Sequence, residues 1–255
     1  MRLNHVETGS GPPVVLLHGL FGAARNFGAV QRALAPVFRV IALDARNHGA
    51  SPHAAGMRYE TLAADVLETL DAIDVPHAAV IGHSMGGKTA MRAAVMAPER
   101  FDRLLVADIA PVPYQHGNNG VAAAMRAIPL DAALSRAAAE AALMDAVATP
   151  ATRAFLVQNI QFGPSPHWRI GLDEIAAAIP DLEGWETPPG TYDGPVLFVS
   201  GARSDHVLPE HRPAIRALFP ATRFVTVKNA GHWLHADNPA GFLSVVEAFL
   251  RDWKG

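Results

Sequence analysis

The sequence predicts an α/β fold in which a mostly parallel, twisted sheet is flanked by helices. Short apolar runs alternate with longer segments of helical periodicity, which is typical of strands joined by crossover helices. The runs are apolar at almost every position, as expected for strands that are buried on both faces. A chain of 255 residues, half of them hydrophobic, is long enough to form one large unit of this kind with an insertion.

The elements are predicted in chain order from these patterns. An edge strand is expected at residues 2–7, and buried strands are predicted at residues 14–17, 39–43, 78–81, 104–107, 196–199 and 223–227. Helices are predicted at residues 59–73, 85–96 and 241–253, because apolar side chains recur there on one face. In the first of these helices Leu62, Val66 and Leu70 share the face that would pack on a sheet.

Residues 113–192 interrupt the alternation. They contain no strand candidate, only Ala-rich helical pieces at residues 121–127, 130–147 and 152–161. A crossover between two parallel strands needs far fewer residues. We therefore expect a core made of residues 1–112 and 193–255, with residues 113–192 as a helical lid that is not an independent domain.

Composition excludes several classes of function. The net charge is −3 and the basic residues form no stripe, so neither nucleic acid nor an anionic membrane is an expected partner. Cysteine is absent, which excludes disulfides, thiolate metal sites and a cysteine nucleophile. No signal-peptide region, membrane-spanning run or paired-histidine zinc motif is found. These features predict a cytoplasmic protein that acts on a small molecule without a metal or organic cofactor, whereas the oligomeric state stays open.

The strongest chemical motif is Gly82-His83-Ser84-Met85-Gly86, between a predicted strand and a predicted helix. A serine on so tight a turn has a strained backbone, and the residues two before and two after it must be small. Gly82 and Gly86 meet this requirement. Ser84 is therefore the predicted nucleophile.

A serine nucleophile needs a base, an acid that orients the base, and donors for an oxyanion. His232 follows the last predicted strand and is the expected base. Asp205 and Asp108 each follow a strand, and either could serve as the acid; we favour Asp205. The oxyanion donors are expected to be the backbone N–H groups of Met85, at the helix start, and Leu20, in the turn after the first core strand.

The remaining histidines are predicted to have supporting or unrelated roles. His83 is expected to pack and His18 to brace its turn, whereas His206 and His235 are candidates for positions near the site. The other histidines considered are expected to be ordinary surface or packing residues: His5, His53, His77, His116, His167 and His211.

Several motifs together resemble the α/β-hydrolase superfamily, and within it the YbfF-like esterases and their mitochondrial abhydrolase relatives. The motifs are HGLFG at 18–22, DARNHG at 44–49, GHSMGGK at 82–88, DIAP at 108–111 and AGHWLHAD at 230–237. The resemblance implies an α/β-hydrolase fold with a helical lid inserted after the sixth sheet strand. It also implies hydrolysis of carboxylic esters and acyl-CoA thioesters. Members of this group often lack an acid at the position of Asp205 and use the one that corresponds to Asp108, whereas this sequence has both.

The predicted reaction is therefore a two-step acyl transfer through Ser84 and His232, with a small-molecule ester or acyl-CoA as substrate. Apolar and aromatic side chains of the turns and the lid are the candidate pocket walls: Phe21, Met85, Met125, Phe155, Phe162, Trp168 and Trp233. Lys88, Arg92 and Arg126 could meet an anionic substrate, although a solvated helix face is the more ordinary location for them.

Other functions remain open on the same residues. A carbon–carbon bond hydrolase, a menaquinone-pathway lyase or a cofactor-free haloperoxidase would use the same triad. A haloalkane dehalogenase is disfavoured because it needs aspartate where Ser84 stands. A non-catalytic small-molecule receptor is the distant alternative, since such a protein would not need both Ser84 and His232.

Overall fold

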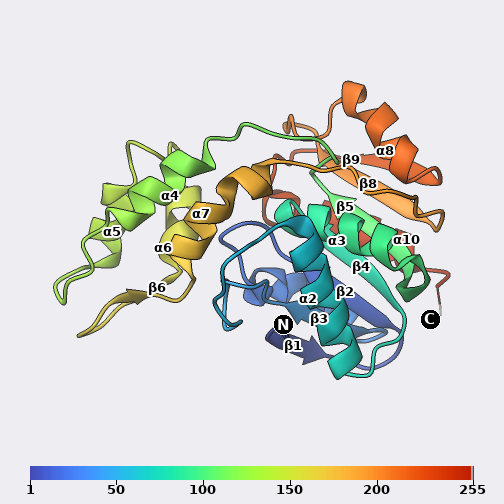
Figure 1. Ribbon diagram of the computed structural model, residues 1–255, viewed down its shortest axis with the longest axis horizontal. Helices are drawn as coiled ribbons and strands as arrows, with labels where there is room; N and C mark the ends of the chain where they lie inside the picture. Colours follow the sequence, from blue (N-terminus) through green and yellow to red (C-terminus); the bar gives the residue numbers. More distant parts are fainter. Residues whose placement is uncertain (254) are drawn as a thin grey trace.

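A computed structural model describes residues 1–253 and 255 of the chain (Figure 1). Over these residues seven strands form one sheet in the order β1-β3-β2-β4-β5-β8-β9, in which β1 is antiparallel to β3 and the other neighbours are parallel. The strands are β1 (His5–Thr8), β2 (Pro13–Leu17), β3 (Arg39–Leu43), β4 (Ala78–His83), β5 (Phe101–Ala107), β8 (Val196–Gly201) and β9 (Thr222–Val227). Each predicted strand is present, and the expected edge strand begins at His5 instead of residue 2.

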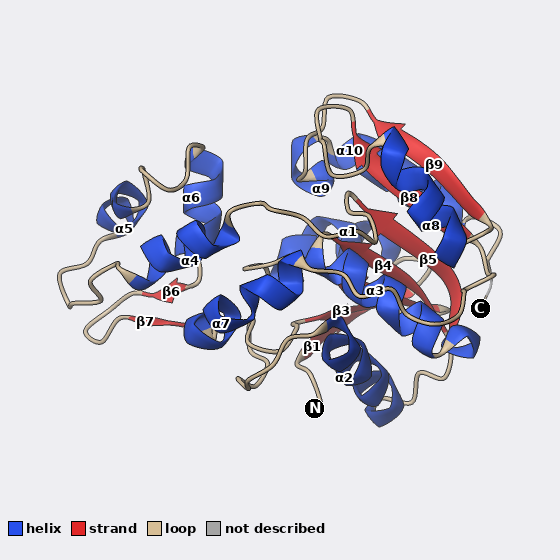
Figure 2. Cartoon of the chain, turned by 45° about the horizontal axis from the view of Figure 1, so that its top comes forward, coloured by secondary structure: helices blue, strands red, loops and turns tan. Residues whose placement is uncertain are grey.

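Helices cover both faces of the sheet (Figure 2). The helices of the core are α1 (Gly28–Leu34), α2 (Tyr59–Ala72), α3 (Met85–Met96), α8 (Arg212–Leu218), α9 (Leu234–Asp237) and α10 (Pro239–Leu250). Strand residues alternate between two buried clusters, so Val15 shares a cluster with α2, α3 and α8, whereas Val14 and Leu16 share one with α1 and α10. Short 3-10 helices lie at Ala24–Phe27, Pro98–Arg100 and Pro209–His211. Among the described residues, none of the helices is long and apolar enough to cross a membrane.

Residues 113–192, called the helical insertion below, lie beside the sheet as a separate layer, coloured green to gold in Figure 1. The insertion contains α4 (Asn118–Arg126), α5 (Arg136–Ala142), α6 (Pro150–Val157), α7 (Leu172–Glu183) and an antiparallel hairpin of β6 (Ile160–Gln161) and β7 (His167–Trp168). The expectation of helix without strand was therefore wrong at this hairpin.

Two further expectations about the insertion need correction. The helix predicted at 130–147 forms only as α5, because Ser135 accepts the Ala138 N–H and starts the helix there. The insertion follows β5, the fifth strand of the sheet along the chain, and not the sixth, because a single antiparallel strand precedes the parallel ones.

A buried cluster joins the insertion to the sheet domain. Tyr59 and Met85 from the core pack with Met125 and Ile175 from the insertion. The Tyr59 hydroxyl donates to the carbonyl oxygen of Leu182 at 2.6 Å, and the Gly171 N–H donates to the carbonyl oxygen of Asn47 at 2.9 Å. The insertion is thus attached to the core by both apolar and polar contacts.

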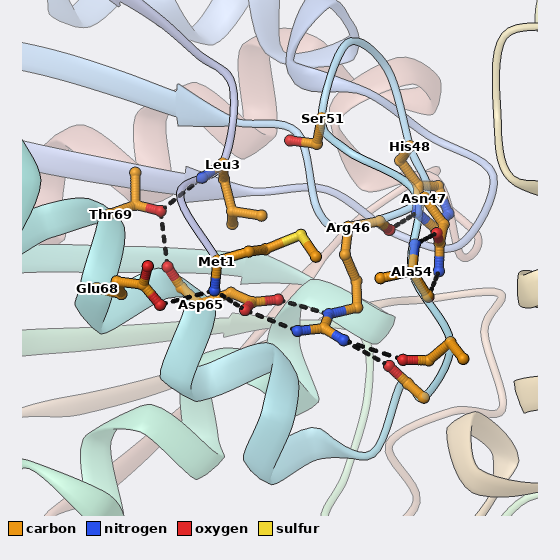
Figure 3. A network of polar contacts seen from close by, with 12 residues as sticks. Met1, Leu3, Arg46, Asn47, His48, Ser51, Ala54, Asp65, Glu68 and Thr69 are labelled. Carbon is orange, nitrogen blue, oxygen red and sulfur yellow. Dashed lines mark hydrogen bonds and ion pairs between the residues drawn. The ribbon is translucent and has the colours of Figure 1, made fainter.

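The loop between β3 and α2 is held by a buried ion pair (Figure 3). Arg46 binds both carboxylate oxygens of Asp65 on α2, at 2.6 and 2.7 Å, and donates to the Gly56 carbonyl at 2.8 Å. Asn47 and Ala54 bridge the loop with two further hydrogen bonds of 2.9 and 2.7 Å. Because both ends of the loop are tied in this way, the residues between them have defined positions.

Candidate active site

Ser84 occupies the turn between β4 and α3 with a backbone that side chains rarely adopt, φ +54° and ψ −120°. A Cβ at Gly82 would lie 2.2 Å from the Gly86 carbonyl oxygen, and one at Gly86 would lie 2.2 Å from the Leu17 carbonyl oxygen. Only glycine fits at these two positions. The steric reason for the motif therefore holds in the structure.

Ser84 is the first member of a hydrogen-bonded chain of three side chains. Its Oγ lies 3.0 Å from Nε2 of His232, which comes from the loop between β9 and α9. Nδ1 of the same ring lies 2.9 Å from Oδ2 of Asp108, just after β5. Since a carboxylate accepts, Nδ1 carries the proton and Nε2 is free to accept one from the serine hydroxyl.

The structure brings Asp108, and not Asp205, to His232. The Asp108 side chain is fully buried and also accepts hydrogen bonds from the Gly201 N–H, at 3.0 Å, and from the Ser204 hydroxyl. Asp205 is 89% exposed, and its carboxylate lies 3.3 Å from the ring of His206. The turn after β8 directs Ser204 inward and Asp205 outward, so the preference for Asp205 is corrected to Asp108.

A stack of imidazole rings extends from His232 toward the helical insertion. His206 lies parallel to His232 with 3.8 Å between ring centroids, and His116 lies on His206 at 4.4 Å. Burial, together with the neighbouring histidines, lowers the pKa of His206 to about 4, so this ring is neutral near pH 7. The expectation that His116 is an ordinary residue was wrong, because it lines the cavity described below.

Three side chains around His232 could also bind a metal ion. Asp108, His206 and His232 each offer a ligand atom, and these atoms lie within 4.8 Å of one another. A cation at that point would compete with the bond between His232 and Asp108. Metal binding and the serine–histidine chain are thus alternative uses of these atoms.

Two backbone N–H groups are available beside Ser84. The Met85 N–H is the first of α3 and has no helical acceptor. The Leu20 N–H has no acceptor within residues 1–253 and 255, whereas the next amide, Phe21, donates to His48. Among the described residues neither expected oxyanion donor has a hydrogen-bond acceptor, and both residues border the cavity.

The cavity in front of Ser84 is lined by both the core and the helical insertion. Among the predicted wall residues, Phe21, Met85, Phe155 and Trp233 line it. Met125 is instead buried within the cluster that joins insertion and core, and Phe162 and Trp168 pack against that cluster from the hairpin end. Residues that were not predicted also line it: Tyr59, Ile109, Tyr114, Asn118, Val121, Thr152, Leu156, Leu182 and Glu183.

Lys88 has a buried amino group at the wall of this cavity, one helical turn after Ser84. Its ammonium donates to the Gly184 carbonyl oxygen at 2.7 Å and lies 4.9 Å from the ring centre of Tyr114. Burial lowers the pKa of Lys88 to about 7. The expectation of a solvated helix face was wrong for Lys88 and also for Arg92, which is buried and donates to the Glu186 carbonyl oxygen. Helical periodicity does not reveal that the insertion covers this side of α3.

The two histidines beside these loops have supporting contacts. His83 is buried and lies 2.8 Å from the His232 carbonyl oxygen, as expected for a packing residue. His18 bonds within its own turn and to the next loop: Nδ1 donates to the Gly19 carbonyl oxygen at 2.7 Å, and Nε2 accepts from the Ala45 N–H at 3.0 Å. The serine hydroxyl is instead hydrogen-bonded to His232.

Comparison with known proteins agrees with the fold. A family model described as alpha/beta hydrolase fold matches residues 12–239. The sn-1-specific diacylglycerol lipase ABHD11 of Mus musculus is 38% identical over 248 residues, covering 94% of this chain and 81% of the lipase. Esterase YbfF of Escherichia coli K12 is 36% identical, covering 94% of this chain and 93% of its own.

A solved structure is similar over nearly the whole chain. The protein described as a marine microorganism esterase superposes with a TM-score of 0.94 at 35% identity, covering 98% of this chain and 99% of its own. The relatives and this structure share the description of ester hydrolases. The resemblance extends across the helical insertion as well as the core, because the coverage is nearly complete.

Proposed function

Because the chain belongs to the α/β-hydrolase fold family, we propose that it is a serine hydrolase that cleaves carboxylic esters through an acyl-enzyme on Ser84. His232 is the general base and Asp108 is the acid that orients it. The observation that carries the proposal is the continuous hydrogen-bonded chain from Ser84 Oγ through both ring nitrogens of His232 to Asp108. The names of the relatives, an esterase and a lipase, support an ester-hydrolysing enzyme.

The first half of the proposed reaction forms the acyl-enzyme. His232 Nε2 takes the Ser84 proton as Oγ attacks the ester carbonyl carbon. The resulting oxyanion accepts hydrogen bonds from the N–H groups of Leu20 and Met85. The imidazolium is stabilised by Asp108 and then gives its proton to the leaving alcohol. In the second half His232 takes a proton from water as the water oxygen attacks the acyl carbonyl. The imidazolium then returns this proton to Ser84 Oγ, which leaves as the carboxylic acid is released.

We further propose that the helical insertion acts as a lid and forms part of the acyl pocket. Phe155 and Leu182 from the insertion line the cavity in front of Ser84 together with Leu20 and Trp233 from the core. Such apolar walls favour an uncharged acyl chain next to the reacting carbonyl. The reaction as written needs no metal and no organic cofactor.

The proposal is tested with p-nitrophenyl esters of increasing acyl length. The wild type should hydrolyse them with a burst of one p-nitrophenolate per active protein, and Ser84→Ala should lose at least about 10³ in kcat. Undiminished turnover in the alanine variant would refute the serine mechanism. Acyl-CoA esters of the same acyl groups, assayed beside the oxygen esters, test whether thioesters share the site.

A further inference from the structure

Phe21 has a strained backbone at the position where the candidate oxyanion loop turns. It is a bulky residue with φ +59°, a left-handed conformation that is unfavourable for such a side chain and persists only when neighbouring groups hold it. Phe21 follows Leu20, whose N–H is a proposed oxyanion donor. The direction of the Leu20 N–H therefore depends on what holds Phe21.

His48 holds the amide side of Phe21. Its Nδ1 lies 2.8 Å from the Arg46 carbonyl oxygen, which can only accept, so Nδ1 carries the proton. Its Nε2 consequently presents a lone pair and accepts the Phe21 N–H at 3.0 Å. The ring is completely buried, and burial lowers the pKa of His48 to about 3, which keeps the lone pair available. His48 lies on the loop that is tied at Arg46 and Asn47 (Figure 3).

Asn159 holds the carbonyl side of the same residue, and it comes from the helical insertion. Its Nδ2 donates to the Phe21 carbonyl oxygen at 2.8 Å. Asn159 lies between α6 and β6 along the chain, and its side chain is completely buried. Oδ1 accepts from Arg25 at 3.2 Å and its backbone oxygen accepts from the Arg169 N–H at 2.8 Å, so the amide has a fixed orientation.

A second contact between the two loops mirrors the first. His18 in the oxyanion loop accepts the Ala45 N–H, just as His48 in the other loop accepts the Phe21 N–H. The two rings lie 5.1 Å apart. Each loop therefore supplies a neutral imidazole to a backbone amide of the other, and Asn159 adds the contact from the insertion.

We propose that His48 and Asn159 are positioning residues for the oxyanion hole and form a two-sided clamp on the Phe21 backbone, one on its N–H and one on its carbonyl oxygen. The clamp keeps Phe21 left-handed and aims the Leu20 N–H at the developing oxyanion. The helical insertion thereby contributes to transition-state stabilisation through Asn159, in addition to shaping the pocket. This inference rests on the proposed esterase function, because it assigns the clamp to the acyl-transfer step.

The clamp predicts a loss in kcat with little change in KM. One oxyanion donor is worth about 10² to 10³ in turnover, and a misdirected donor should lose part of that, so Asn159→Ala and His48→Ala should each lower kcat about 10- to 100-fold. Asn159→Asp, which keeps the shape but cannot donate, should behave like Asn159→Ala. His48→Gln, which restores an acceptor, should recover part of the loss.

Affinity for a trifluoromethyl ketone provides a readout that a general loss of structure would not reproduce. The ketone forms a tetrahedral adduct with the serine, so its inhibition constant should rise by the same factor as kcat falls, with concentrations normalised by active-site titration. His53→Ala is the matched control, because His53 lies on the same loop as His48 and contacts the insertion through the Arg169 carbonyl. It should leave kcat within about twofold.

The outcomes separate the clamp from the proposed function. Wild-type protein without Ser84-dependent ester hydrolysis would overturn both. An active wild type with unchanged kcat and ketone affinity in Asn159→Asp and His48→Ala would overturn the clamp alone. A rise in KM at constant kcat would also overturn it, because that result would assign these residues to substrate binding.

Discussion

Several site residues are held in backbone conformations that ordinary side chains avoid. Ser84 and Asp108 both have φ +54°, one at the start of α3 and the other just after β5. Each such residue costs about 1–3 kcal/mol. The Asp108 backbone is stabilised in part by its N–H, which donates to the Val199 carbonyl oxygen at 2.8 Å. These backbone conformations direct both side chains toward the ring of His232.

The identity of the acid is tested by comparing Asp108→Asn with Asp205→Asn. An amide at position 108 cannot stabilise the imidazolium and favours the wrong tautomer, so kcat should fall about 10³- to 10⁴-fold. Asp205 is exposed to solvent, and its amide variant should stay within about twofold of wild type. Steady-state kinetics on one p-nitrophenyl ester measures both. A collapse in Asp205→Asn beside an active Asp108→Asn would reverse the assignment.

His206 is predicted to support His232 through ring stacking. A stacked aromatic contact contributes about 0.5–1.5 kcal/mol, so His206→Ala should lower kcat/KM about 2- to 12-fold. His206→Phe retains a flat ring and should recover most of this loss. Because the pKa of His206 is lowered to about 4, removing it should add or remove no titration between pH 6 and 8 in the rate profile. Equal losses in the alanine and phenylalanine variants would contradict a stacking role.

Sequence reasoning identified the proposed nucleophile and the proposed base, but it favoured an aspartate that does not contact the base. The motif around Ser84 and the loop position of His232 depend on local sterics and chain order, which a sequence contains. Asp108 and Asp205 both follow strands, and the choice between them depends on the φ of Asp108 and on the turn that sends Ser204 inward. These are three-dimensional properties that no local pattern expresses. His48 and Asn159 were missed for the same reason, since each acts on a backbone group far away in sequence.

At the scale of elements, buried strands were the most predictable part of the fold. Their apolar runs must be continuous because helices cover both faces, and β3 has the bounds that were predicted. Alanine-rich segments were less predictable. High helix propensity suggested one helix at 130–147, whereas a cap at Ser135 limits α5 to seven residues. Propensity alone therefore overestimates helix length where capping residues interrupt it.

The turn from β4 into α3 should not accept a side chain at Gly86. The Cβ of Gly86→Ala would meet the Leu17 carbonyl oxygen at 2.2 Å, which forces two backbone segments apart. The free energy of unfolding should fall by about 1–3 kcal/mol, with loss of ester hydrolysis. Gly120→Ala is the matched control, because its Cβ meets nothing within 4 Å on α4, and it should be neutral or slightly stabilising. Urea unfolding of both variants measures this, and a stable, active Gly86→Ala would contradict the steric argument.

At the scale of the whole molecule, the chain consists of a sheet domain and a helical insertion that meet at the candidate site. Near the C-terminal end of α7 this junction depends on Lys88. Its ammonium binds the Gly184 carbonyl, where the helix dipole favours a cation, and the rings of Tyr59 and Tyr114 flank it at 5.4 and 4.9 Å. The buried amino group of Lys88 thus links α3 to the insertion.

The lowered pKa of Lys88 predicts that its contribution to stability depends on pH. Between its folded-state pKa of about 7 and the ordinary lysine value of 10.5, the unfolded chain carries the proton and the folded chain does not. In that interval the wild type should therefore gain stability relative to Lys88→Met as the pH rises, by a few kcal/mol in total. The free energy of unfolding of Lys88→Met relative to wild type should be highest below pH 7, where the wild type must bury a charged ammonium. Urea unfolding of both proteins at pH 6, 8 and 10 gives this difference, with Arg126→Met as control because Arg126 forms only an exposed ion pair with Asp173. A stability difference that is constant from pH 6 to 10 would mean that the junction holds Lys88 in the same protonation state throughout.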